Sequence, residues 1–81
     1  MTNHDKIETA VKKILTEKLD VQDGQLVDQA RFHEDLGIDS LDKIEVLMEI
    51  EKEFNLKVPD EDAEKLTTVG SLVQYVNGNT H

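Results

Sequence analysis

Residues 40–54 read SLDKIEVLMEIEKEF, and they have the apolar period of an amphipathic helix. On a helical wheel one arc of this segment collects its bulky apolar side chains, Ile44, Val46, Leu47, Ile50 and Phe54. We expect that arc to face a hydrophobic core. The helix should end at Asn55, because the segment up to Pro59 breaks the helical pattern.

Three other segments also have helical features. Residues 5–19 repeat apolar side chains at helical intervals, at Ile7, Val11, Ile14, Leu15 and Leu19. Residues 60–66 predict a short acidic helix with Ala63 and Leu66 turned inward. Thr68 is a good N-cap for a last helix that Asn77 and Gly78 should end; its apolar residues are Val69, Leu72, Val73 and Val76, with Tyr75 beside them. Nothing alternates with the period of a strand, so we predict an all-α fold of four helices around one core.

Residues 20–37 lack sustained periodicity and form a long connection. Leu26, Val27, Phe32 and Leu36 are its expected anchors in the core. A connection of this length in a small domain is usually functional or packed across the core.

The composition limits the chain to one modest domain, residues 1–81. There is no cysteine, which excludes disulfides, thiolate metal sites and a thiol nucleophile of the chain's own. His4, His33 and His81 are too far apart for zinc-ligand spacings, so we expect three surface residues and no metal site. The polar N-terminus has no secretory signal and no stretch is long enough to span a membrane. The sequence therefore predicts a soluble, cytoplasmic protein, or one already processed from a longer precursor.

Negative charge is concentrated in one part of the chain. The formal net charge is −9, and residues 34–64 contain 12 acidic residues and three lysines, which accounts for the whole excess. Such a field repels nucleic acid and anionic membranes and attracts basic protein surfaces. An acidic face kept only for solubility is the alternative.

Two apolar residues of the central helix lie away from its apolar arc. Leu41 and Met48 stand among Glu45, Lys52 and other charged residues, as in a partner-binding face where hydrophobic groups supply affinity and acids supply orientation. The alternative is a core that wraps further around the helix. Glu51 falls inside the apolar arc, and the wheel offers no reason for it.

The start of the central helix presents a hydroxyl to unpaired backbone N–H groups. Gly37 allows a tight turn, Asp39 is placed to cap the helix, and Asp42 would complete a capping box. Ser40 then lies in the first turn, where the N–H groups and the helix dipole favour a phosphate ester. Ser40 could also be no more than a capping residue. A catalytic serine fits less well, because no base or nucleophile elbow is present and the nearest histidine, His33, stands on a flexible connection.

These residues resemble the discrete acyl carrier proteins of type II fatty acid synthesis. The resemblance lies in FHEDLGIDSLD (32–42), in the following helix through Phe54, in VPDEDAEKLTTV (58–69) and in YVNG (75–78). It implies an antiparallel four-helix bundle with a short third helix. It also implies a carrier, not an enzyme, in which a phosphopantetheinyl transferase uses coenzyme A to esterify Ser40 with 4′-phosphopantetheine, with Asp39 and Gly37 in the attachment site.

The resemblance further implies partners and a place for the acyl chain. Ketoacyl synthases, reductases, dehydratases and acyltransferases would bind a monomeric carrier through basic patches, and the implied contact residues are Asp39, Leu41, Glu45, Met48 and Glu51. The acyl chain would be sheltered in the bundle, with Ile44, Leu47, Ile50, Phe54, Ala63, Leu66 and Tyr75 as candidate lining residues, although these could equally be plain core. Lys43 and Lys52 depart from a more uniformly acidic helix, and Arg31 and His33 add basic character near Ser40.

Other functions remain open from the sequence alone. A carrier for polyketide assembly or for D-alanine transfer would share the serine and the bundle, although residues 58–69 favour the fatty acid type. A non-covalent acidic adaptor would use Ser40 only as a cap. A serine hydrolase is disfavoured by the missing base.

Overall fold

The computed structural model describes residues 3–79 and the side chains of residues 6–79. Its elements are α1 (Asn3–Lys18), the 3₁₀ turn η1 (Asp23–Gln25), α2 (Ser40–Phe54), α3 (Asp60–Lys65) and α4 (Val69–Asn79). No strand occurs in this part of the chain, and one isolated bridge joins Arg31 to Thr68. The predicted all-α fold with a short third helix is therefore confirmed.

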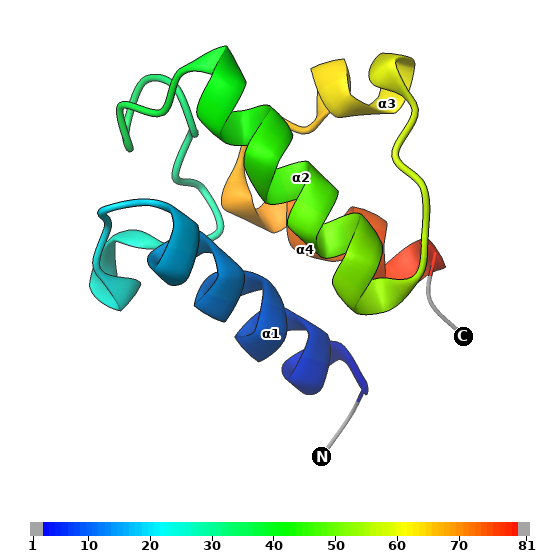
Figure 1. Ribbon diagram of the computed structural model, residues 1–81. Helices are drawn as coiled ribbons and strands as arrows, with labels where there is room; N and C mark the ends of the chain where they lie inside the picture. The colour runs from blue at the N-terminus through cyan, green and yellow to red at the C-terminus, as the bar shows by residue number, and fades with distance from the viewer. Residues whose placement is uncertain (1–2, 80–81) are drawn as a thin grey trace.

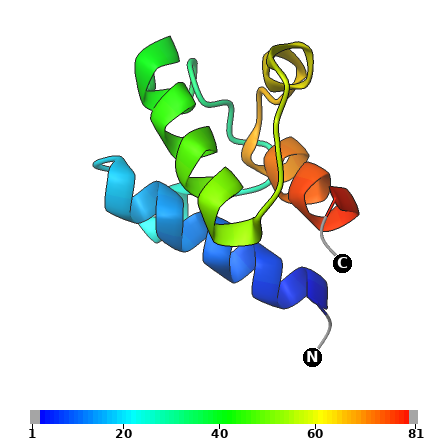
Figure 2. The ribbon, with the colours of Figure 1, turned by 45° about the vertical axis from the view of Figure 1, so that its right-hand side comes forward.

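The three longer helices enclose the core, and α3 lies to one side of it. α1 packs against both α2 and α4, and α1 and α2 run in opposite directions (Figure 1). After a turn of the view, α3 still lies on the far side of the molecule from α1 (Figure 2). This arrangement leaves the first turns of α2 at one end of the molecule.

Local signals define both ends of α2. Asp39 has an extended backbone, and its carboxylate accepts a hydrogen bond from the Asp42 N–H at 2.9 Å. At the other end Asn55 takes the left-handed conformation, with φ 52° and ψ 50°, and its N–H donates to the Glu51 carbonyl. Asparagine tolerates this conformation better than most residues, which explains why the helix ends where the sequence predicts.

The last helix begins as expected but continues further. The Ser71 N–H donates to Thr68 Oγ1, and the Thr68 N–H donates to Ser71 Oγ, each at 3.1 Å, so both residues share the cap. The prediction that Asn77 and Gly78 end this helix was wrong, because it continues to Asn79. The Asn79 side chain donates to the Tyr75 carbonyl at 2.7 Å and so satisfies an acceptor of the last turn.

The core contains the apolar residues that the helical spacing selected in α1 and α4. In α2 the buried residues are Val46, Leu47 and Ile50, and Phe54 is half-buried. Ile44 was expected in the same arc, but its side chain is 53% exposed. It lies at the edge of the arc nearest Leu41 and Met48, which are exposed as well.

The long connection packs across the core, as its length suggested. Leu26 and Phe32 are buried anchors and Leu36 is half-buried, as predicted. Val27 is 53% exposed, so the prediction that it anchors the connection in the core was wrong. Ala30 and Ile38 are buried as well.

Backbone hydrogen bonds fix this connection to the segment before α4. The Phe32 N–H donates to the Thr67 carbonyl and the Val69 N–H to the Ala30 carbonyl, both at 3.0 Å. The Gly70 N–H donates to the Asp28 carbonyl at 2.9 Å. Because the partners are about 40 residues apart, no local pattern in the sequence announces this pairing.

Of the three histidines expected on the surface, His33 is exposed. His81 and the side chain of His4 lie outside the described residues. In the described part of the chain, no cluster of His, Cys, Asp or Glu side chains could hold a metal ion, and no helix is both long enough and apolar enough to cross a membrane.

Candidate functional site

Ser40 is the first residue of α2, and its side chain is exposed. Gly37 makes the preceding turn with φ +66°, a conformation that side chains rarely adopt, so glycine is needed there. Asp39 takes the capping role by binding the Asp42 N–H. Within the described residues the Ser40 hydroxyl has no hydrogen-bond partner, and it stands at the positive end of the helix dipole.

The other serine of the chain is a useful contrast. Ser71 also stands in the first turn of a helix, but its hydroxyl donates to the Thr68 carbonyl at 2.7 Å and accepts from the Thr68 N–H. Its side chain is half-buried. Ser40 is therefore the serine whose hydroxyl is available to a second molecule.

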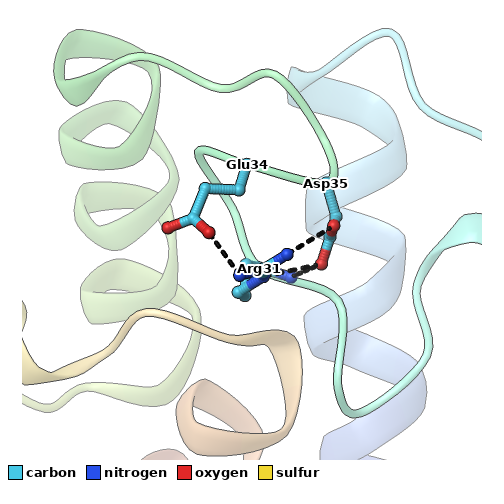
Figure 3. Close-up of polar contacts among 3 residues, drawn as sticks. All are labelled: Arg31, Glu34 and Asp35. Carbon is cyan, nitrogen blue, oxygen red and sulfur yellow. Dashed lines mark hydrogen bonds and ion pairs between the residues drawn. The ribbon is translucent and has the colours of Figure 1, made fainter.

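Arg31, near Ser40 in the connection, is held by two acidic residues. Its guanidinium bonds Asp35 at 3.2 and 3.3 Å and pairs with Glu34 (Figure 3). These side-chain hydrogen bonds raise the pKa of Arg31 and lower the pKa of Asp35, which also accepts from the Arg31 backbone N–H at 2.8 Å. The expected basic character of Arg31 is thus largely neutralised, and the cluster instead fixes the shape of the loop before α2.

A pocket of about 320 Å³ opens beside Ser40. Phe32 and Ile38 line it from the core side, and Lys43 and Thr67 line it together with Ser40. Lys43 is half-buried, and this burial lowers the pKa of its ammonium group. In the sequence Lys43 is only a departure from a uniformly acidic helix, because the cavity that it borders is formed by the fold.

An apolar stripe runs along the outer face of α2. Leu41, Ile44 and Met48 are 66%, 53% and 52% exposed, and their spacing places them on one side of the helix. Glu45 is exposed beside them. The exposure predicted for Leu41 and Met48 is confirmed, and Ile44 belongs to this stripe.

Glu51 has a structural partner. Its carboxylate accepts a hydrogen bond from the Val58 N–H at 3.0 Å and is half-buried. This bond connects the end of α2 to the segment that precedes α3, which explains an acid within the apolar arc. Glu51 is therefore less free to contact other proteins than Asp39 and Glu45, which are exposed.

The candidate acyl-lining residues do not all point into the bundle. Leu47, Ile50 and Leu66 are buried and Phe54, Ala63 and Tyr75 are half-buried, but Ile44 faces outward. The Tyr75 hydroxyl donates to the Asp62 carboxylate at 2.7 Å, which ties α4 to α3. The interior holds an apolar void of about 10 Å³ beneath Lys43, too small for more than one water molecule.

Comparison with known proteins agrees with this geometry. Residues 9–76 match the family model described as the phosphopantetheine attachment site. The acyl carrier protein of Enterococcus faecalis, whose solved structure is described for its high thermal stability, is similar to this chain at 35% identity and a TM-score of 0.82, with 98% of this chain and 100% of that one covered. The chain belongs to the acyl carrier protein family. Its cofactor is therefore phosphopantetheine, and its family is one of carriers rather than catalysts.

The residues of this carrier fit such a group. A covalent phosphate ester needs an exposed hydroxyl, favourable donors near the phosphate and room alongside. The start of α2 provides the hydroxyl of Ser40, the positive end of a helix and the neighbouring pocket.

Proposed function

We propose that Ser40 carries the 4′-phosphopantetheine arm and that the protein delivers growing acyl chains to the enzymes of fatty acid biosynthesis. When attached, the arm supplies a thiol that holds the acyl group as a thioester, in a chain with no cysteine of its own. The observation that carries the proposal is the exposed hydroxyl of Ser40 at the start of α2, which bonds none of the described residues, within a chain of the phosphopantetheine attachment family.

The residues around Ser40 have separate tasks in this proposal. Asp39 caps the helix and so leaves the serine hydroxyl free for the transferase. Gly37 turns the chain so that the helix starts at the end of the molecule. Residues 1–81 are proposed to act as a single carrier domain, in keeping with one hydrophobic core and a family match over residues 9–76.

A docking face for partner enzymes surrounds the serine. We define this partner face as Asp39, Leu41, Ile44, Glu45 and Met48, which are all exposed. Its apolar stripe would supply affinity, and its acids would orient basic patches on the phosphopantetheinyl transferase, ketoacyl synthases, reductases, dehydratases and acyltransferases. Glu51 would contribute less, because Val58 holds its carboxylate. The carrier is proposed to act as a monomer in the cytoplasm, beside these enzymes.

Shelter for the acyl chain is proposed inside the bundle, between the half-buried residues of α3 and α4 and the buried side of α2. Leu47, Ile50, Phe54, Ala63, Leu66 and Tyr75 remain the candidate walls. Because the interior void is about 10 Å³, an acyl chain would have to separate packed side chains to enter.

The modification itself can be measured directly. Wild-type protein incubated with coenzyme A, Mg²⁺ and a phosphopantetheinyl transferase should gain the mass of one phosphopantetheine. Ser40→Ala should gain nothing, whereas Ser71→Ala should still be modified, because Ser71 only caps α4. A wild-type mass that does not change, or a group found on another residue, would contradict the proposal.

A further inference from the structure

The pocket beside Ser40 has so far been described only as room next to the attached group, with no role for the residues that line it. Its volume of about 320 Å³ falls within the range of small-molecule sites, about 300 to 1,000 Å³. Its apolar side is formed by Phe32 and Ile38, which the core holds in place. Its polar side includes Thr67, Lys43 and Ser40 itself, together with Arg31, His33, Glu34 and Asp39. The pocket is therefore a preformed space that begins at the modified residue.

Lys43 differs from the basic residues whose ion pairs the structure shows. Lys12, Lys18 and Arg31 each pair with an acidic side chain, whereas Lys43 has no ion-pair partner in the described part of the chain. It is also half-buried, and it lines both the apolar void and the pocket. Burial lowers its pKa, and the attraction of Glu64 opposes that shift only in part. A partly desolvated cation without a counter-ion gains free energy when an anion binds beside it.

The position of Lys43 in α2 suits an anion attached to Ser40. The two residues are three apart in one helix, so their Cβ atoms lie about 5 to 6 Å from each other on neighbouring positions of the surface. A phosphate ester on Ser40 Oγ would lie within reach of the lysine ammonium group. The acids that border the pocket are already engaged, since Glu34 pairs with Arg31 and Asp39 accepts from the Asp42 N–H.

His33 contributes to the pocket by holding the loop that forms its wall. Its Nδ1 lies 3.3 Å from the Ile38 carbonyl oxygen, and a hydrogen bond there requires the proton on Nδ1. This contact closes the loop from Phe32 to Ile38, which the Ile38 N–H also closes by donating to the Phe32 carbonyl at 2.9 Å.

We propose that this pocket is a docking site for the phosphate-proximal half of the prosthetic arm, with Lys43 as the counter-ion of the phosphodiester and with Phe32 and Ile38 against the branched apolar carbons that follow it. The inference rests on the proposed attachment at Ser40. It implies that the free carrier holds the first part of the arm against its own surface and that a partner enzyme displaces that part on docking.

NMR spectra of the apo and arm-bearing proteins test this docking. In the arm-bearing wild type, the methyl protons of the arm should show through-space contacts to the Phe32 ring and the Ile38 methyl groups, and amide shifts should change at Thr67 as well as next to Ser40. Lys43→Gln should reduce these shift changes at least twofold, and Lys43→Arg should keep most of them. Lys52→Gln is the matched control, because Lys52 is exposed, lies outside the pocket and carries the same charge in the same helix. Shift changes confined to Ser40 and Leu41, or an equal loss in both glutamine variants, would overturn the inference.

Two further measurements make the result decisive. Intact mass is recorded before each spectrum: a protein that takes no arm contradicts the proposed function, whereas one that takes the arm without contacting the pocket contradicts only this inference. The pKa of the Lys43 ammonium group, followed by NMR in the wild type, should be higher with the arm than without it. An unchanged pKa would overturn the role of Lys43 even if Lys43→Gln fails to fold.

Discussion

Ser40 and Ser71 both stand in the first turn of a helix, but among the residues that the structure describes the Ser71 hydroxyl has a hydrogen-bond partner and the Ser40 hydroxyl has none. In α4, Thr68 and Ser71 cap the helix together, so the Ser71 hydroxyl is engaged in hydrogen bonds within the protein. In α2, Asp39 caps alone, so the following serine is left exposed. The identity of the residue before Ser40 is therefore part of the modification site, even though Asp39 need not contact the arm.

The titration of Tyr75 reports on the surroundings of its hydroxyl, which lies 3.4 Å from the Lys57 carbonyl oxygen and 2.7 Å from the Asp62 carboxylate. Its hydroxyl donates to Asp62, and this bond to a carboxylate raises the pKa of Tyr75 above its ordinary value of 10.0. Because the pKa is raised in the folded protein, the bond stabilises the fold fully below the unfolded pKa, and that contribution is lost as pH rises through the folded value.

The chain has one tyrosine and no tryptophan, so tyrosinate absorbance follows this residue alone. The midpoint in the wild type should lie above 10.0, and Asp62→Asn should move it down toward that value. Asp60→Asn is the control, since Asp60 is exposed and does not bond Tyr75. A midpoint that Asp62→Asn leaves in place would show that the contact does not persist in solution.

At the scale of elements, α4 depends on a close approach to the long connection. A Cβ added at Gly70 would lie 2.9 Å from the Asp28 carbonyl oxygen, a backbone atom that also accepts from the Gly70 N–H. A Cβ at Gly78 would meet nothing within 4 Å. Alanine substitutions at these two glycines of one helix therefore distinguish the effect of helix propensity from the effect of packing.

Gly70→Ala should therefore destabilise the protein by about 1 to 3 kcal/mol, because the clash exceeds the gain of about 1 kcal/mol in helix propensity. Gly78→Ala should be neutral or stabilising by up to about 1 kcal/mol. Urea unfolding followed by circular dichroism measures both. Equal effects in the two variants would mean that the connection does not press on α4.

At the scale of the whole molecule, the net charge of −9 acts through its distribution. The acids of α2 lie beside the exposed stripe of Leu41, Ile44 and Met48, so the long-range attraction to a basic partner is directed to the same face that gives apolar contact. α1 contributes Lys18, which contacts Glu49 at 3.6 Å at the border of this face.

Glu45→Lys should lower the association rate with the transferase or a synthase roughly tenfold at low salt, and the difference should shrink as ionic strength rises. Glu53→Lys gives the same change of charge on an exposed residue at the far end of α2 and should have a smaller effect. Stopped-flow association at several salt concentrations measures both. If the two variants behave alike, only net charge matters and the partner face is not used.

Short-range signals in the chain were enough to predict the helices, the cap at Asp39, the end at Asn55 and the exposure of Leu41 and Met48, because caps and apolar periods act within one or two turns. The outward position of Ile44, the exposure of Val27, the continuation of α4 past Gly78 and the bond from Glu51 to Val58 could not be foreseen in this way. The bond from Glu51 to Val58 depends on how the chain turns after α2, and the last turn of α4 depends on a side chain that bonds one of its carbonyl groups. The exposure of Ile44 and Val27 depends on which distant segment covers a given surface. The pocket at Lys43 is of the same kind, since it exists only because Phe32 pairs with Thr67 across the sequence and brings the connection against the first turns of α2.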